Sequence, residues 1–217
     1  GRMLFSLEKY GIKTEYFSFD KKNFFSFIRC LRKLRRHIEK EKVDIIHARS
    51  RFPAWIAYFV SKNYERVHFV TSIHGFYKKY FYSKVMVKGE RVIAVSEQLK
   101  KYAIDFLKGD ERKIRIVYNG IDFEPLKKIK KQTHPEFIIG GIGRFTKVKG
   151  FQYILSACKR LEDEIPNLKI LLVGEGRYKS ILEEMAKKYK INIEFQKGTP
   201  FEFLPVMDLL IAPHENP

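Results

Sequence analysis

Short apolar runs alternate with longer amphipathic segments along this chain, and the alternation stops once and then starts again. Strands joined through helices form parallel sheets with right-handed crossovers. Two such series predict an α/β fold with two doubly wound, Rossmann-like parallel-sheet domains that face each other across a cleft at the carboxyl ends of their strands. The runs expected to be strands are residues 12–19, 43–48, 67–73, 91–96, 114–119, 137–142, 169–173, 191–195 and 209–212.

The alternation fails between Gly120 and Pro135, which indicates a linker. We therefore predict a first domain over residues 1–133 and a second domain over residues 134–217. Helical spacing of apolar residues, together with Pro53 suited to a first turn and Ser96 as an N-cap, predicts the helices. They are residues 2–10, 22–41, 53–61, 96–107, 150–165 and 177–189.

The helix expected over residues 22–41 has one apolar and one basic face. The apolar residues, expected to point inward, are Phe24, Phe27, Ile28, Leu31, Leu34 and Ile38. The basic face holds Arg29, Arg32, Lys33, Arg35 and Arg36. Such a face is attracted to anionic lipid headgroups, although an ordinary crossover helix with a solvated basic side explains the pattern equally well.

The positive charge is concentrated in the first part of the chain. Residues 1–130 hold 30 lysines and arginines against 14 acidic residues, whereas residues 131–217 hold 13 against 11. A net charge of +16 on the first part attracts nucleic acid, anionic lipid or phosphorylated substrates, and a merely lysine-rich surface is the simpler alternative. The longest uncharged apolar stretch, residues 52–61, is about half of the roughly 20 residues that a bilayer-spanning helix needs.

Two glycine-containing turns follow predicted strands of the second part. The first, GRFTKVKG at residues 143–150, lies between a strand and a helix, where α/β proteins bind phosphate. It matches neither the Walker loop nor the GxGxxG fingerprint. Two such turns on one sheet edge predict a nucleotide site, although a turn that uses glycine for geometry alone remains the alternative for each. The candidate residues are Gly143, Arg144, Lys149, Gly174, Glu175 and Gly176.

Polar residues also end two strands of the first part, at HARSR (47–51) and TSIHGF (71–76). Such residues face the ligand cleft in parallel sheets. His47 alone is more typical of a structural histidine, whereas His74 is followed by a glycine and is the better candidate. The six histidines and two cysteines show no metal-ligand spacing. Cys30 and Cys158 lie in helical segments and are expected to be buried thiols, typical of a reducing compartment.

Several segments together resemble the GT-B glycosyltransferases of family 4, which are retaining, nucleotide-sugar-dependent enzymes. The stretch from His47 through Trp55 to His74 is most similar to bacterial members that build lipopolysaccharide and other cell-surface glycans. The matching segments are DIIHARSR (44–51), SIHGFY (72–77), RVIAVS (91–96), VYNGID (117–122), GR (143–144), KG (149–150), LVGEG (172–176) and MDLLIAP (207–213).

The resemblance implies transfer of a sugar from a nucleoside diphosphate sugar, with retention, to a glycan or lipid-linked acceptor. Negative charge grows on the β-phosphate as the diphosphate leaves, so Arg144 and Lys149 are expected to stabilise the transition state without a metal or another cofactor. His74 is expected at the transferred sugar, and the attacking nucleophile is the acceptor hydroxyl. Gly143, Gly174, Glu175 and Gly176 are implied at the donor, and His47, Arg49 and Arg51 at the acceptor.

The family pattern also has parts that this sequence does not show. A strand and glycine loop precede the helix expected at residues 2–10, and a Glu-x7-Glu motif follows the segment that ends at Pro213. Glu215 lies too early for the first glutamate of that motif. We therefore expect a chain incomplete at both ends.

Two other classes of function stay open at this point. One is a nucleotide-sugar epimerase or non-catalytic relative on the same fold. The other, suggested only by the charge, is a nucleic-acid-binding protein, which would need interleaved aromatic residues or a recognition helix that the sequence does not show. The expected location is cytoplasmic and peripheral at the inner face of a membrane, with an anionic membrane surface as a further partner and no nucleic acid.

Overall fold

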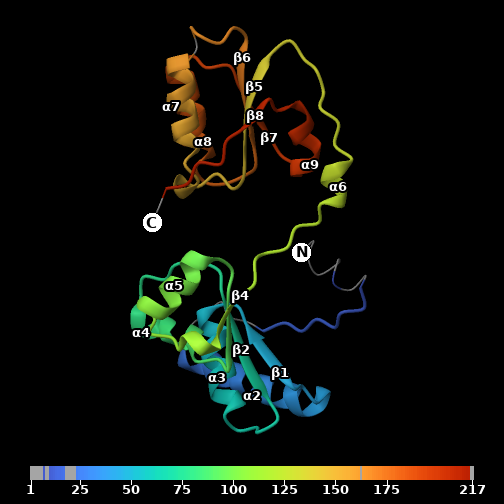
Figure 1. Cartoon of the computed structure of the whole chain (residues 1–217), viewed down its shortest axis with the longest axis vertical. Coiled ribbons are helices and arrows are strands. Elements are labelled where there is room, and N and C mark those ends of the chain that lie inside the picture. The colour runs from blue at the N-terminus through green and yellow to red at the C-terminus, as the bar shows by residue number, and fades with distance from the viewer. Residues whose placement is uncertain (1–6, 8–9, 18–22, 162, 216–217) are drawn as a thin grey trace. The chain divides into compact units, whose positions relative to one another are not determined.

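The computed structural model describes residues 7, 10–17, 23–161 and 163–215 (Figure 1). The chain divides into two compact units, Gly1–Gly120 and Ile121–Pro217, and each contains a four-stranded parallel sheet, as the alternating pattern predicts. This division precedes the predicted boundary between residues 133 and 134. The expected linker packs with the second unit, because the Gln132 amide donates to the Pro205 carbonyl at 2.9 Å and Lys131 pairs with Asp208 at 2.8 Å.

The sheet of the first unit runs in chain order without a reversal. Its strands are β1 (Ile45–Ala48), β2 (His68–Ile73), β3 (Arg91–Ala94) and β4 (Ile114–Ile116). Each pairs in parallel with the next, and the register aligns His47 of β1 with Val70 of β2.

Helix α3 joins this sheet to the long helix α2. Its small residues Ala54 and Ala57 belong to the core cluster of the sheet, while Ile56 and Val60 pack with Cys30 and other residues of α2. No described helix of the chain combines the length and the hydropathy needed to cross a bilayer. The helices of this unit are α2 (Phe24–Glu41), α3 (Arg51–Ser61), α4 (Tyr80–Ser83) and α5 (Glu97–Asp105), with 3₁₀ turns η1 (Lys84–Val87) and η2 (Glu111–Lys113).

Local capping explains where two of these helices begin. The Ser96 side chain accepts a hydrogen bond from the Leu99 amide at 3.2 Å, which confirms the predicted N-cap of α5. The Asn23 side chain accepts from the Ser26 amide at 2.9 Å and caps α2 in the same way. Pro53 lies in the first turn of α3, as predicted.

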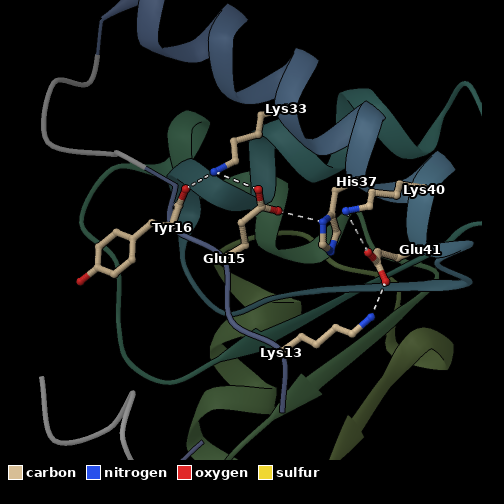
Figure 2. A network of polar contacts seen from close by, with 7 residues as sticks. All are labelled: Lys13, Glu15, Tyr16, Lys33, His37, Lys40 and Glu41. Carbon is tan, nitrogen blue, oxygen red and sulfur yellow. Dashed lines mark hydrogen bonds and ion pairs between the residues drawn. The ribbon is translucent and has the colours of Figure 1, made fainter. Parts of the chain in front are cut away.

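The strand predicted over residues 12–19 is wrong for residues 12–17, which form neither strand nor helix; residues 18–19 lie outside the described residues. Instead of pairing with a strand, this segment is bound to α2 by ion pairs (Figure 2). Lys13 pairs with Glu41 at 3.1 Å, and Glu15 pairs with Lys33 at 3.2 Å. Apart from Leu7 and Tyr10, the helix predicted over residues 2–10 also lies outside the described residues.

In the parallel sheet of the second unit, the order in which successive strands are added reverses once. Its strands are β5 (Phe137–Ile142), β6 (Leu168–Val173), β7 (Ile193–Gln196) and β8 (Leu209–Leu210), in the spatial order β7-β6-β5-β8. The chain moves outward from β5 to β7 and then crosses back to place β8 on the other side of β5. The point between β5 and β8, where the order reverses, is where doubly wound sheets bind ligands.

Helical segments cover both faces of this second sheet (Figure 1). Alternate strand residues point to opposite faces, so Ile139 packs with α7 and α8 while Ile138 packs with Met207 and the segment around α9. The elements are α6 (Glu124–Lys127), α7 (Phe151–Leu161), α8 (Lys179–Tyr189) and α9 (Pro200–Phe203), with 3₁₀ turns η3 (Lys147–Lys149) and η4 (Leu204–Val206).

Candidate functional site

In the first unit, polar side chains meet at the carboxyl ends of β1 and β2. Because His47 is aligned with Val70 and side chains two residues apart share a face, His47 lies beside Ser72, and Arg49 lies beside His74. The His47 Nε2 atom is in close hydrogen-bond contact with the Ser72 hydroxyl. The Arg49 Nε–H donates to His74 Nε2 at 3.1 Å. Three of the predicted residues therefore form one cluster.

Both imidazoles of this cluster are biased toward the neutral form. Partial burial and then the Arg49 charge lower the pKa of His47. Partial burial, Arg49 and His47 lower the pKa of His74 in that order. No carboxylate among the described residues pairs with Arg49, so its charge acts on the two histidines without a counter-ion.

Arg51 lies in a different environment from the other predicted residues of this unit. Its guanidinium stacks on the rings of Tyr77 and Tyr82, with 4.8 and 5.3 Å to the ring centroids, and contacts the Ser83 hydroxyl at 3.4 Å. Cation–π contacts of this kind fix the segment that follows His74 against α3. Arg51 thus has a structural role that its place in the sequence did not predict.

Helix α5 fixes the same segment from another side. The Tyr102 hydroxyl donates to the Tyr77 carbonyl at 2.7 Å and accepts from the Tyr77 amide at 3.0 Å. The Trp55 indole donates to the Tyr82 carbonyl at 3.0 Å. The segment after β2 is therefore anchored at Tyr77 and at Tyr82, and His74 stands at its start.

In the second unit, the two predicted glycine turns lie against each other. The Gly143 amide donates to the Val173 carbonyl at 2.9 Å, and the Phe145 amide donates to the Glu175 carbonyl at 2.8 Å. Phe145 is fully buried between Phe151 and Phe195 and anchors the first turn in the core. The sequence prediction that both turns open on one sheet edge is confirmed.

Glycine is required where these turns touch. A Cβ atom on Gly174 would lie 1.9 Å from the Gly143 carbonyl oxygen, and one on Gly176 would lie 2.1 Å from the Phe145 carbonyl oxygen. Both residues also have positive φ, at 150° and 156°. The close approach of two backbones is one physical reason for these glycines, alongside any role in approaching an anion.

The Arg144 and Lys149 side chains carry positive charge at this edge. Arg144 is exposed and Lys149 is half-buried, and neither is paired with a carboxylate in the part of the chain that the structure describes. By contrast, the Glu175 carboxylate forms an ion pair with Lys197. Both cations thus remain available to an anionic ligand.

The segment that follows β8 supplies a carboxylate to the same region. Glu215 Oε1 accepts from the Tyr153 hydroxyl at 2.6 Å and from the Gln152 amide at 3.0 Å, both in the first turn of α7. The Glu215 amide donates to the Val148 carbonyl at 2.9 Å. From the sequence, Glu215 lies too early for the first glutamate of the family motif and so has no expected role; its place beside α7 depends on the sheet order, which brings the residues after β8 next to those after β5.

Ser72 belongs to the predicted polar segment TSIHGF but is not singled out by the sequence as a site residue. Its signal is its place two residues before His74 on the same strand, which gives it a shared face with His74. Within the described ranges, no group of three or more histidine, cysteine, aspartate or glutamate side chains is arranged to hold a metal ion. Cys30 and Cys158 are buried, as predicted.

Two family models match the chain and together span most of it. The first, Glycosyltransferase Family 4, matches residues 7–125. The second, Glycosyl transferases group 1, matches residues 122–207. The models meet at the start of the second compact unit.

Individual relatives agree with these models. A capsular polysaccharide biosynthesis glycosyltransferase of Staphylococcus aureus is 28% identical over 74% of this chain and 48% of its own length. The crystal structure of a glycosyltransferase from Rickettsia africae superposes with a TM-score of 0.83 at 25% identity, covering 99% of this chain and 62% of that one. An Anabaena protein crystallised with UDP and glucose gives a TM-score of 0.76 at 18% identity, over 99% of this chain and 64% of that one, and so shows the fold alone.

These solved structures identify the two-unit architecture as the GT-B fold, as the sequence motifs predicted. The chain spans between 36% and 52% of the length of the curated relatives that it matches.

Proposed function

Because the chain belongs to glycosyltransferase family 4, we propose that it transfers a sugar from a nucleoside diphosphate sugar to a glycan or lipid-linked acceptor. The observation that carries the proposal is the carboxyl edge of the second sheet around β5, which lies between β6 and β8. There the strand order reverses, two glycine turns are bonded together, and Arg144 and Lys149 have no carboxylate partner among the described residues. This combination suits a diphosphate.

The chemical role of these cations follows from the reaction. When the bond between the sugar and the diphosphate breaks, the sugar becomes oxocarbenium-like and negative charge develops on the leaving β-phosphate. Fixed cations stabilise that charge more in the transition state than in the ground state, and this difference accelerates the step. Arg144 and Lys149 are proposed for this task, with Gly143, Gly174, Glu175 and Gly176 in contact with the donor.

The residues of the first unit are proposed for the other reactant groups. His74 is assigned to the transferred sugar, and His47, Arg49 and Arg51 are assigned to the acceptor side. We propose retention of the anomeric configuration, with the acceptor hydroxyl as the nucleophile. Proton NMR of the first product formed, before mutarotation, distinguishes retention from inversion.

The acceptor class is proposed from charge and from relatives. The Staphylococcus aureus relative is named for capsular polysaccharide biosynthesis, and the first part of this chain has a net charge of +16. An anionic, lipid-linked glycan at a membrane surface fits both facts. The protein is therefore proposed to act in the cytoplasm at such a surface.

The test of the proposed function is protection of the protein by its donor. A panel of nucleoside diphosphate sugars is added singly, and the unfolding temperature is measured by calorimetry. One donor should raise the unfolding temperature in a concentration-dependent way, because a ligand that binds only the folded state stabilises it. The same donor should then be consumed when an acceptor extract is supplied. If no donor in the panel protects the protein or is consumed, the proposal is wrong; epimerisation of the donor without acceptor indicates the epimerase alternative.

A further inference from the structure

We infer that Arg49 is a positioning residue for His74, which it holds neutral, with its proton on Nδ1 and its ring fixed at the end of β2. This inference deepens the proposed function and rests on it, since His74 is there assigned to the transferred sugar. The geometry that carries it is the 3.1 Å hydrogen bond between Arg49 Nε and His74 Nε2.

The direction of this hydrogen bond decides the tautomer. A guanidinium has only N–H donors, so the His74 Nε2 atom must accept with its lone pair. A neutral imidazole has one N–H, and with Nε2 as acceptor that proton must lie on Nδ1. His74 can then offer one N–H donor, at Nδ1, to a sugar or phosphate oxygen, and its Nε2 lone pair is not free to act as a base.

The electrostatic surroundings favour the same state. Among the described residues, the titratable group that acts on the ring besides Arg49 is His47, whose pKa is itself lowered by burial and by Arg49. Further along the loop lies Tyr77, on whose ring the guanidinium of Arg51 from α3 stacks. None of these groups is a carboxylate, so nothing among them stabilises a protonated His74.

The backbone around both residues is held in place independently. Arg49 directly follows β1, and His74 directly follows β2, and these strands pair in register along their whole common length. The segment after His74 is fixed by Tyr102 of α5. A change at Arg49 therefore alters the charge and hydrogen bonding of His74 without removing its support.

The experiment combines histidine NMR on the ligand-free protein with kinetics. The variants are Arg49→Met, which removes the donor and the charge, and Arg49→Lys, which keeps the charge. Arg91→Met is the matched control, because Arg91 is exposed at the amino end of β3 and its guanidinium contacts the Glu90 carbonyl. His74→Gln assigns the ring signals among the six histidines.

In the parent protein, the ¹⁵N–¹H spectrum should show His74 as the Nδ1–H tautomer, titrating below the ordinary histidine range. In Arg49→Met, its pKa should rise only partway toward the ordinary value, because the partial burial that lowers it most remains, and the single tautomer should be lost, whereas Arg49→Lys and Arg91→Met should stay near the parent pKa. The turnover number kcat of Arg49→Met should fall about 10- to 100-fold near neutral pH, with its acid limb moved to higher pH, because a misplaced ring loses its alignment. Arg49→Lys should recover part of that loss.

Three results would overturn the inference. The first is an Nε2–H tautomer in the parent protein. The second is a His74 titration in Arg49→Met that equals that of Arg91→Met. The third is a rise in the acceptor KM at unchanged kcat, which would leave Arg49 with only the acceptor contact assigned above and no positioning role for His74. If the NMR results are as expected but no donor is turned over by the parent, the Arg49–His74 assignment is supported and the proposed function is wrong.

Discussion

At the level of single residues, the second unit has cations that are paired with a carboxylate and cations that have no such partner among the described residues. Lys169 pairs with Glu194 at 3.0 Å and Lys179 pairs with Glu183 at 3.2 Å, so these lysines are compensated on the surface. Arg144 and Lys149 have no such partner among the described residues, although they lie within one short turn. Two cations of one turn without a carboxylate partner attract an anion, which is why the turn suits a diphosphate.

Replacing either cation should affect turnover more than folding. In Arg144→Ala and Lys149→Ala, kcat with saturating donor should fall about 10²- to 10³-fold, as when one donor to a developing oxyanion is removed. Lys147→Ala is the matched control, because Lys147 is an exposed lysine of the same turn. Calorimetry should show similar unfolding temperatures for all three variants. Near-parent turnover in Arg144→Ala or Lys149→Ala would contradict their assignment.

The same two cations lead to a prediction about divalent metals. If Arg144 and Lys149 supply the positive charge at the leaving diphosphate, a metal is not needed for that task. Treatment with a chelator should therefore leave kcat unchanged, and adding Mg²⁺ or Mn²⁺ should not raise it. A strict dependence on either metal would show that the cations do not replace it.

At the level of secondary-structure elements, the turns after β5 and β6 behave as one structure. Each gives a backbone hydrogen bond or a close contact to the other, and Gly174 fits only because it has no Cβ. The sequence shows the two glycine motifs separately. Their contact depends on β5 and β6 being neighbours in register, which is a property of the folded sheet.

The substitution Gly174→Ala should therefore destabilise the second unit. Its Cβ would collide with the Gly143 carbonyl and its positive φ would be strained, so we expect a loss of about 2 kcal/mol or more in the free energy of unfolding. Gly120→Ala is the control, since no atom lies within 4 Å of a Cβ there and its φ is not positive. Urea unfolding measures both. Equal stability of the two variants would mean that the turns can separate without penalty.

Helix α2 shows where periodicity fails within an element. The helix and its buried Ile38 are as predicted, but Phe24, expected to point inward, is 72% exposed. Helical spacing identifies which residues of α2 share a face. It does not show which turns of that face are covered by the neighbouring helix α3. Phe24 lies at the first position of α2, and the residues of this helix that pack against the core are Phe27, Leu31 and Leu34 instead.

At the level of the whole molecule, part of the positive charge of the first unit is concentrated on a surface of α2. A groove of about 1330 Å³ lies along this helix and is lined by Phe24, Phe25 and several basic side chains. Lys33 and Lys40 contact Glu15 and Glu41, as Figure 2 shows, so part of the charge is neutralised. Arg29, Arg32 and Arg36 line the same groove and have no carboxylate partner in the described part of the chain.

We predict that these three arginines bring the protein to anionic membranes. Reversing them together, by Arg29→Glu, Arg32→Glu and Arg36→Glu, should weaken binding to anionic liposomes about 10²-fold or more, since each cation near such a surface contributes about 1 kcal/mol. Binding of the parent should also weaken as salt is raised. Sedimentation with vesicles of increasing anionic lipid content measures the effect.

The control for this surface carries the same change in charge elsewhere in the first unit. Lys101, Lys108 and Lys113 are exposed residues in and after α5, and their reversal to glutamate should weaken binding much less. Nucleotide binding should be unchanged in both triple variants. Equal liposome binding by the α2 variant and the parent would make α2 a solvated crossover helix.

The sequence by itself determined the two parallel-sheet units and the order of their elements, because burial in a strand and in a helix impose different periods on the apolar residues. It also placed Gly143, Gly174, His47 and His74 at strand ends, since these positions follow directly from the runs that precede them. What it did not determine depends on pairing between distant segments. Residues 12–17 have a strand-like pattern but bind α2 through ion pairs, because a strand forms only where a neighbour supplies hydrogen bonds.

Only the tertiary structure decided which of these strand ends meet. The register of β1 on β2 brings Arg49 to His74, and a shift of one residue would turn Arg49 to the other face. The crossing of the chain from β7 to β8 brings Glu215 to the start of α7, far from it in sequence. Side-chain patterns encode which residues are buried, whereas register and strand order are set by packing energies summed over whole sheets, so the chemistry of the site emerges at that level.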